Sequence, residues 1–102
     1  MGATPPPPAR VQIVAREFSY ALSRQTIRAG RAVLELRNLG QDAHDLVLER
    51  VGGTRVVLRW PLTQPGETVD RSVRLAPGTY RLTCDVANHR ALGMRAILVV
   101  RR

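Results

Sequence analysis

The chain has 102 residues, 44% of them hydrophobic, which suits one domain with one core and argues against disorder. No apolar run approaches the roughly 20 residues that cross a membrane, so no membrane span is expected, and a single cysteine excludes a disulfide within the chain. The net charge is +8, and all sixteen basic residues are arginines scattered along the sequence. Without a basic stripe interleaved with aromatic residues, no nucleic-acid partner is expected.

Residues 1–10 are expected to form a Pro-rich flexible tail that precedes one domain over residues 11–102. The four consecutive prolines at 5–8 favour an extended polyproline II conformation and lack amide donors, so they suit neither a helix nor a central strand. This segment has neither the basic start nor the apolar run of a secretion signal. Either the protein is cytosolic, or the chain begins after a removed signal or anchor.

The rest of the chain predicts short strands separated by turns. Turn signals recur at Gly30, Gly52-Gly53, Pro65-Gly66 and Pro77-Gly78, and no helical periodicity is present. We expect strands over residues 11–20, 25–28, 31–38, 44–51, 54–60, 67–75, 79–84 and 95–101. This spacing of strands and turns predicts an all-β sandwich or barrel.

The alternation of side chains along a strand places two metal-binding residue types inside the molecule. Cys84 ends a strand on the same face as Tyr80 and Leu82, and His44 begins a strand on the same face as Leu46. A sandwich builds its loops at such strand ends. Cys84 by itself remains open to three interpretations: a buried thiol, a reactive thiol or a metal ligand.

The loop that follows Cys84 favours the third interpretation. Cys84, His89 and Met94 recur at intervals of five residues, and His44 is the only other histidine. Each residue alone is more often part of a core, but together they contain the donors of a blue-copper site: two His, one Cys and a weak axial Met. We therefore predict one copper ion, cycling between Cu(I) and Cu(II), held by His44, Cys84, His89 and Met94.

These residues resemble the cupredoxins, the family of plastocyanin and azurin. The resemblance rests on the C-x4-H-x4-M pattern of residues 84–94, on the strand that follows it, and on the Asn-Leu-Gly-Gln-Asp-Ala-His-Asp sequence of residues 38–45. It implies a Greek-key β-sandwich of seven to eight strands with copper near one end. It also implies that Asp45 directs its backbone N–H at the cysteine sulfur and braces the ligand loop. Where some relatives carry Pro-Gly before the second histidine, this chain has Val86-Ala87-Asn88, so the turn geometry is left open.

The resemblance implies a type 1 blue copper electron-transfer protein and not an enzyme. Its expected partners are redox proteins (a cytochrome, oxidase or reductase) with an acidic docking surface, which would meet the apolar collar of residues 91–93 around His89. The expected state is a monomer in an extracytoplasmic location, the periplasm or cell surface, with any native signal or anchor absent from the chain given. The alternatives are a copper carrier or storage module of the same fold and a sandwich that binds no metal.

Overall fold

The computed structural model describes residues 4–53 and 55–102, which form nine β-strands in two packed sheets. Over these two ranges no helix is long and apolar enough to cross a membrane. The strands are β1 (Ala9–Arg16), β2 (Ser19–Leu22), β3 (Thr26–Arg28), β4 (Gly30–Asn38), β5 (His44–Arg50), β6 (Val56–Thr63), β7 (Thr68–Leu75), β8 (Gly78–Thr83) and β9 (Arg95–Arg101). The predicted all-β sandwich is confirmed.

The two sheets have the strand orders β2-β1-β4-β7 and β3-β9-β8-β5-β6. Two pairs are parallel, β1 with β4 and β3 with β9, whereas the other neighbours are antiparallel. The chain changes sheet five times, between β2 and β3, β3 and β4, β4 and β5, β6 and β7, and β7 and β8, and β8 returns beside β5. Because the chain crosses between the sheets, strands that are distant in the sequence become neighbours within a sheet, as in a Greek-key sandwich.

The first strand differs from the prediction and explains why the strand count is one above the expected maximum. The segment 11–20 does not run straight but folds back at Glu17-Phe18, so that β1 and β2 form a hairpin with Arg16 opposite Ser19. No glycine, proline or asparagine marks this turn in the sequence, which is why it was missed. Strand β1 also begins at Ala9, opposite Ala32 of β4, and takes in the last two residues of the expected tail.

Strand β6 is a second difference, because it continues past Pro61 to Thr63 where the prediction ended at residue 60. Proline cannot donate to a strand ladder, so it is tolerated mainly at sheet edges and bulges. Both conditions hold here. Strand β6 is the last strand of its sheet, and its pairing with β5 shifts register between His44 and Leu46. Thr54, the predicted start of this strand, lies outside the described residues.

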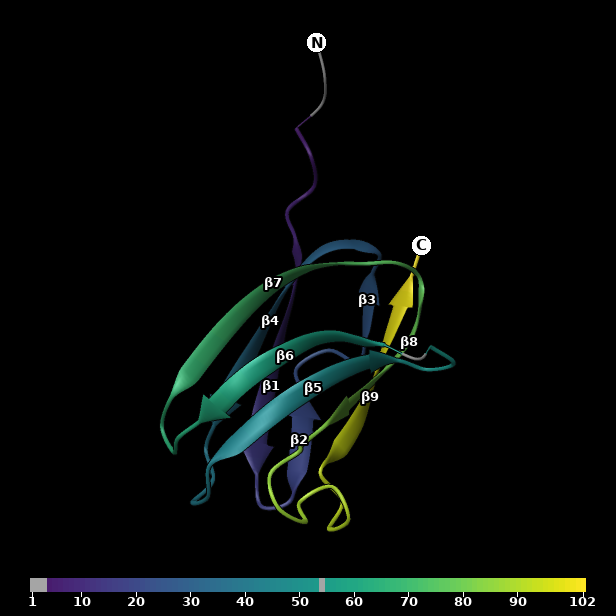
Figure 1. Cartoon of the computed structure of the whole chain (residues 1–102). Coiled ribbons are helices and arrows are strands. Elements are labelled where there is room, and N and C mark those ends of the chain that lie inside the picture. Colours follow the sequence, from purple (N-terminus) through teal and green to yellow (C-terminus); the bar gives the residue numbers. More distant parts are fainter. Residues whose placement is uncertain (1–3, 54) are drawn as a thin grey trace.

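The core lies between the sheets and follows the predicted alternation. Leu34 and Leu36 of β4, Leu82 of β8 and Leu98 of β9 are fully buried. Burial of each such side chain contributes about 1.5–3 kcal/mol, which makes the strand faces, and hence the strand ends, well determined. His44 begins β5 and Cys84 directly follows β8. Figure 1 shows that the β8–β9 loop lies at the opposite end of the sandwich from the N-terminal segment and the C-terminus.

Candidate metal centre

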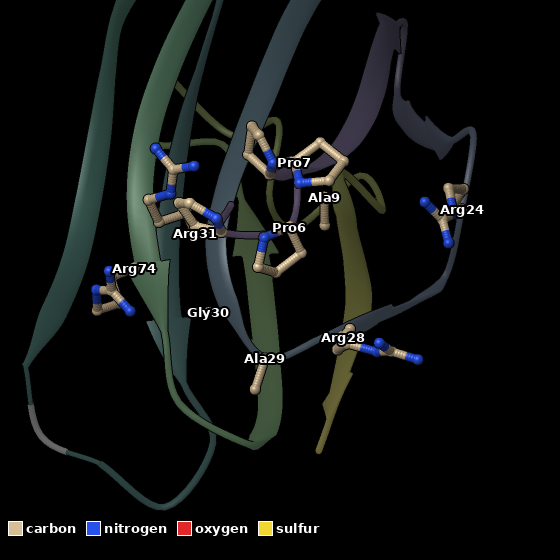
Figure 2. A pocket seen from close by; sticks show the side chains of 11 residues that line it. Pro6, Pro7, Ala9, Arg24, Arg28, Ala29, Gly30, Arg31 and Arg74 are labelled. Carbon is tan, nitrogen blue, oxygen red and sulfur yellow. The ribbon is translucent and has the colours of Figure 1, made fainter. Parts of the chain in front are cut away.

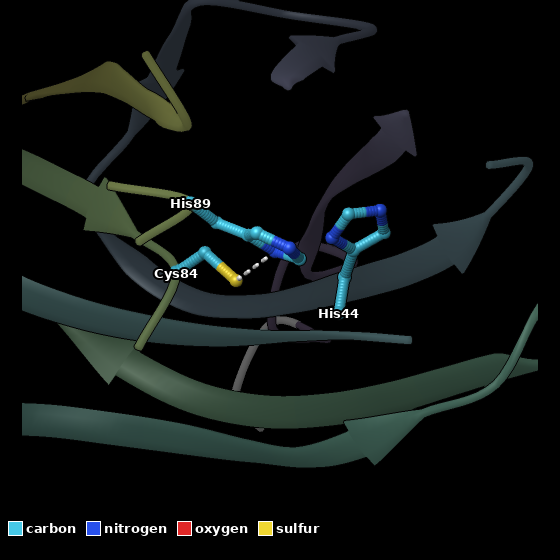
Figure 3. Close-up of side chains that lie close together, drawn as sticks. All are labelled: His44, Cys84 and His89. Atoms are coloured by element: carbon cyan, nitrogen blue, oxygen red, sulfur yellow. Dashed lines mark hydrogen bonds between the residues drawn. The ribbon is translucent and has the colours of Figure 1, made fainter. Parts of the chain in front are cut away.

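Three potential metal ligands from two distant parts of the sequence meet at the loop end of the sandwich. His44, Cys84 and His89 are all buried, and one donor atom from each lies within 4.8 Å of the other two. The Cys84 Sγ is 3.7 Å from Nδ1 of His89. The two imidazole rings are tilted by 54° with centroids 5.0 Å apart. Figure 3 shows the three side chains converging from the start of β5 and from the β8–β9 loop.

The β8–β9 loop is held by its own backbone. The N–H of His89 donates to the carbonyl of Val86, and the N–H of Leu92 donates to the carbonyls of Asn88 and His89. Ala87, in the segment whose geometry the sequence left open, adopts a left-handed φ of 45°. That conformation is uncommon for a residue with a side chain, so a tight turn replaces the Pro-Gly of some relatives.

Met94 closes this loop. Its N–H donates to the carbonyl of His89 at 3.1 Å, and its own carbonyl accepts the N–H of Cys84 at 3.3 Å. Its side chain is fully buried and belongs to the core that contains Cys84. The backbone therefore places Met94 beside the other two loop residues of the predicted ligand set.

Glu17, in the turn between β1 and β2, is a site residue that the sequence analysis missed. Its Oε1 accepts the backbone N–H groups of Gln41 at 2.7 Å and Asp42 at 2.5 Å, and it lies 3.1 Å from Nε2 of His44. The bond from Asp42, with that from Gln41, holds the Glu17 pKa down to about 2 against the effect of desolvation. The contact also needs Gly40, because a Cβ there would lie 2.5 Å from Oε1. No sequence motif links Glu17 to His44.

The contact with Glu17 determines which nitrogen of His44 is free to bind a metal. An ionised carboxylate only accepts hydrogen bonds, so Nε2 carries the proton and Nδ1 keeps a lone pair. Nδ1 is buried and has no hydrogen-bond partner among the described residues. A buried polar atom without a partner is costly, and a metal ion would satisfy it. Two imidazoles and a thiolate are the donors that copper prefers, so the residues fit that ion.

Asp45 braces the ligand loop with its side chain, as the resemblance implied. Its Oδ1 accepts the backbone N–H of Asp85 at 2.8 Å, which braces the residue after Cys84. Burial raises the pKa of the Cys84 thiol, while the backbone N–H groups of Asp45 and Val86 act in the opposite direction. Tyr20 adds support from β2, because its hydroxyl donates to the carbonyl of Asp45.

No protein-family model and no curated protein matches the chain. Among solved structures it is similar to a dithionite-reduced auracyanin from the photosynthetic bacterium Roseiflexus castenholzii, with a TM-score of 0.76 and 17% identity over 99% of this chain and 100% of that chain. Auracyanin A, described as a blue copper protein from Chloroflexus aurantiacus, gives a TM-score of 0.75 and 21% identity. The match covers 93% of this chain and 100% of that chain. A multicopper oxidase gives a TM-score of 0.63 and 18% identity over 89% of this chain and 41% of that chain.

The β-sandwich shared with these proteins, with one Cys and two His gathered at its loop end, is the cupredoxin fold. The chain therefore has the fold that its sequence resemblance implied. At these identities the comparison concerns the fold, and the chemistry rests on the residues of this chain.

Proposed function

We propose that this chain is a type 1 blue copper protein that transfers single electrons, with His44, Cys84, His89 and Met94 as ligands. The observation that carries the proposal is the cluster of two imidazoles and one cysteine sulfur within 4.8 Å, in which Nδ1 of His44 has no hydrogen-bond partner among residues 4–53 and 55–102. A bound copper ion would supply one-electron chemistry between Cu(I) and Cu(II). The protein itself would hold the ligands in fixed positions, because they project from strand ends and from a loop closed by backbone hydrogen bonds.

Burial of the cluster favours electron transfer over copper transport or storage. The exposed fractions are 0% for His44, Cys84 and Met94 and 6% for His89. A carrier must release its ion, which is easier from an exposed site. The chain's only two histidines both belong to the cluster, so we propose no enzymatic activity, although a multicopper oxidase shares the fold.

The partner proposed is a redox protein that docks over the β8–β9 loop. His89 lies nearer the surface than His44, and Leu92 beside it is 48% exposed. The sequence suggested an acidic partner because the chain is strongly basic, but Arg59 and Arg90 near the loop already pair with Asp85. We therefore propose an apolar contact at this face. The extracytoplasmic location and the monomeric state stay proposals.

The decisive experiment is a visible spectrum of the copper-loaded protein before and after Cys84→Ala. The wild type should show an intense charge-transfer band from thiolate to copper, and the variant should lose that band while its far-ultraviolet circular dichroism is unchanged. A band that survives in the variant would remove Cys84 from the site. Repeated oxidation and reduction without loss of copper would separate an electron carrier from a copper carrier.

A further inference from the structure

Two pairs of arginines face each other across strands at the end of the sandwich farthest from His44 and Cys84. Arg31 of β4 lies directly opposite Arg74 of β7, and Arg28 of β3 lies directly opposite Arg101 of β9. All four side chains are exposed. Like charges in directly opposed positions destabilise a sheet, so each of the two sheets carries an uncompensated cost at the same end.

In the part of the chain that the structure describes, no acidic side chain pairs with these arginines. Among residues 4–53 and 55–102, none of the four arginines, nor Arg24 before β3, forms an ion pair within 4.0 Å. The chain has eight acidic residues, and most of them lie at the metal-cluster end: Glu17, Asp42, Asp45, Glu67 and Asp85. The other end, which we call the basic end, therefore carries five arginines that have no acidic partner among the described residues (Arg24, Arg28, Arg31, Arg74 and Arg101).

A cavity of about 550 Å³ opens at the basic end. Arg24, Arg28, Arg31 and Arg74 line it together with the prolines at 5–8, Ala9, Ala29 and Gly30, and no carboxylate takes part. Figure 2 shows Arg74 and Arg28 on opposite sides of the cavity with the prolines between them. The guanidinium groups thus surround an apolar floor and do not converge on one point.

We propose that the basic end docks on the surface of a bilayer that contains anionic lipid. Separated guanidinium groups match an array of phosphates better than a single ion, and clustered arginines bind anionic membrane surfaces through such phosphates. The apolar floor suits the boundary between headgroups and acyl chains. The cavity has no aromatic residue that could stack on nucleic-acid bases. The surface does not depend on copper, and docking there directs the metal cluster away from the membrane.

The test is co-sedimentation of the full chain with vesicles of phosphatidylcholine alone and of phosphatidylcholine mixed with phosphatidylglycerol. Binding should require the anionic lipid and weaken as salt rises, because surface charges are screened over about 8–10 Å at physiological ionic strength. A duplex DNA oligonucleotide and inorganic phosphate serve as competitors that distinguish a membrane from other sources of phosphate.

Two double variants test which end of the molecule binds the vesicles. Arg31→Gln with Arg74→Gln should weaken vesicle binding about 10- to 30-fold, since each arginine near an anionic surface strengthens binding by about fivefold at most. The matched control, Arg16→Gln with Arg37→Gln, removes the same charge from exposed positions at the metal-cluster end and should change binding less than about threefold. The first variant should fold with an unchanged or higher melting temperature, because it removes a repulsive pair.

Three results would overturn the proposal. One is no binding to the anionic vesicles at low salt. Another is an equal loss of binding in the two double variants, which would show that only net charge matters. The last is DNA or inorganic phosphate that displaces the chain from vesicles at stoichiometric concentration, which would assign the basic end to nucleic acid or to a free anion.

Discussion

At the scale of single residues, the imidazole of His44 has one nitrogen in a hydrogen bond and one without a partner in the described part of the chain. Glu17 bonds Nε2, while Nδ1 points into the cluster with Cys84 and His89. A carboxylate behind a metal-binding histidine fixes the tautomer and the ring orientation and raises the basicity of the ring. Because the β1–β2 turn supplies this carboxylate, the cluster depends on a segment that contributes no ligand.

Replacing Glu17 should weaken copper binding without removing a ligand. Glu17→Ala should lower copper affinity about 10- to 100-fold, the usual effect of losing such a partner. Glu17→Gln keeps an acceptor for Nε2 and should lose less. Affinity is measured by competition with a chelator, and the charge-transfer spectrum reports whether the ring has turned. An affinity for Glu17→Ala within twofold of wild type would show that the contact has no part in the site.

Met94 is predicted to act as a weak axial ligand, so its loss should change the potential more than the occupancy. Met94→Leu keeps the buried volume nearly constant and should cost less than about 1.5 kcal/mol of stability. Copper and the intense band should remain, while the reduction potential rises, because losing a soft donor disfavours Cu(II) more than Cu(I). Voltammetry checks this. Unchanged potential and spectrum would leave Met94 a packing residue, and complete loss of copper would make it a stronger ligand than proposed.

At the scale of elements, the β4–β7 ladder carries a second pair of like charges. Glu35 of β4 lies directly opposite Asp70 of β7. A hydrogen bond with Glu35 and burial raise the pKa of Asp70, while Arg10 opposes the shift. A carboxyl whose pKa is raised on folding binds its proton more tightly in the folded state. The ladder should therefore lose stability as the pH rises from the ordinary pKa of Asp70 through its raised value.

Asp70→Asn should remove the loss of stability that accompanies ionisation of Asp70. At neutral pH the variant should be more stable than wild type by less than about 1 kcal/mol, the scale of one cross-strand charge pair. Near pH 3, below the ordinary pKa of Asp70, the Asp70 carboxyl carries its proton in both the folded and the unfolded chain, so the two proteins should melt at similar temperatures. Thermal melts at the two pH values test this. A variant that is equally stable or less stable at neutral pH would mean that Arg10 already compensates the pair.

At the scale of the whole molecule, the sandwich separates two surfaces. The metal cluster lies under the β8–β9 loop, whereas the N-terminal segment and the C-terminus lie at the other end (Figure 1), together with the arginines of the basic end. The rate of electron exchange should therefore change with substitutions in the β8–β9 loop and stay the same with substitutions at the basic end. His89 is the expected exit, since 6% of it is exposed against none of His44.

A charge placed on the loop should slow exchange. Leu92→Glu should reduce the rate of electron exchange with a redox partner, and of self-exchange, about 3- to 10-fold with little change in the spectrum. The matched control is Val51→Glu in the β5–β6 hairpin, because Val51 is 42% exposed against 48% for Leu92. Stopped-flow kinetics measures both. If the control slows exchange as much as Leu92→Glu, the loop is not the docking surface.

The sequence by itself determined those parts of this protein that depend on neighbours in the chain. The alternation in β4 and β8, the turn at Gly52-Gly53 and the grouping of Cys84, His89 and Met94 in one loop follow from the backbone period and from short loop lengths. Together with His44 at a strand end, they sufficed for the fold class and the predicted ligand set.

Only the tertiary structure decided the contacts that depend on sheet order and register. Sequence patterns did not show that the chain turns at Glu17-Phe18, that Glu17 reaches His44, or that Arg31 stands opposite Arg74. Each pairing joins segments far apart in the chain, and a slip of one residue would turn every side chain to the other face. Packing of the two sheets around one core selects the register, so these contacts are set by the burial of residues elsewhere in the strands.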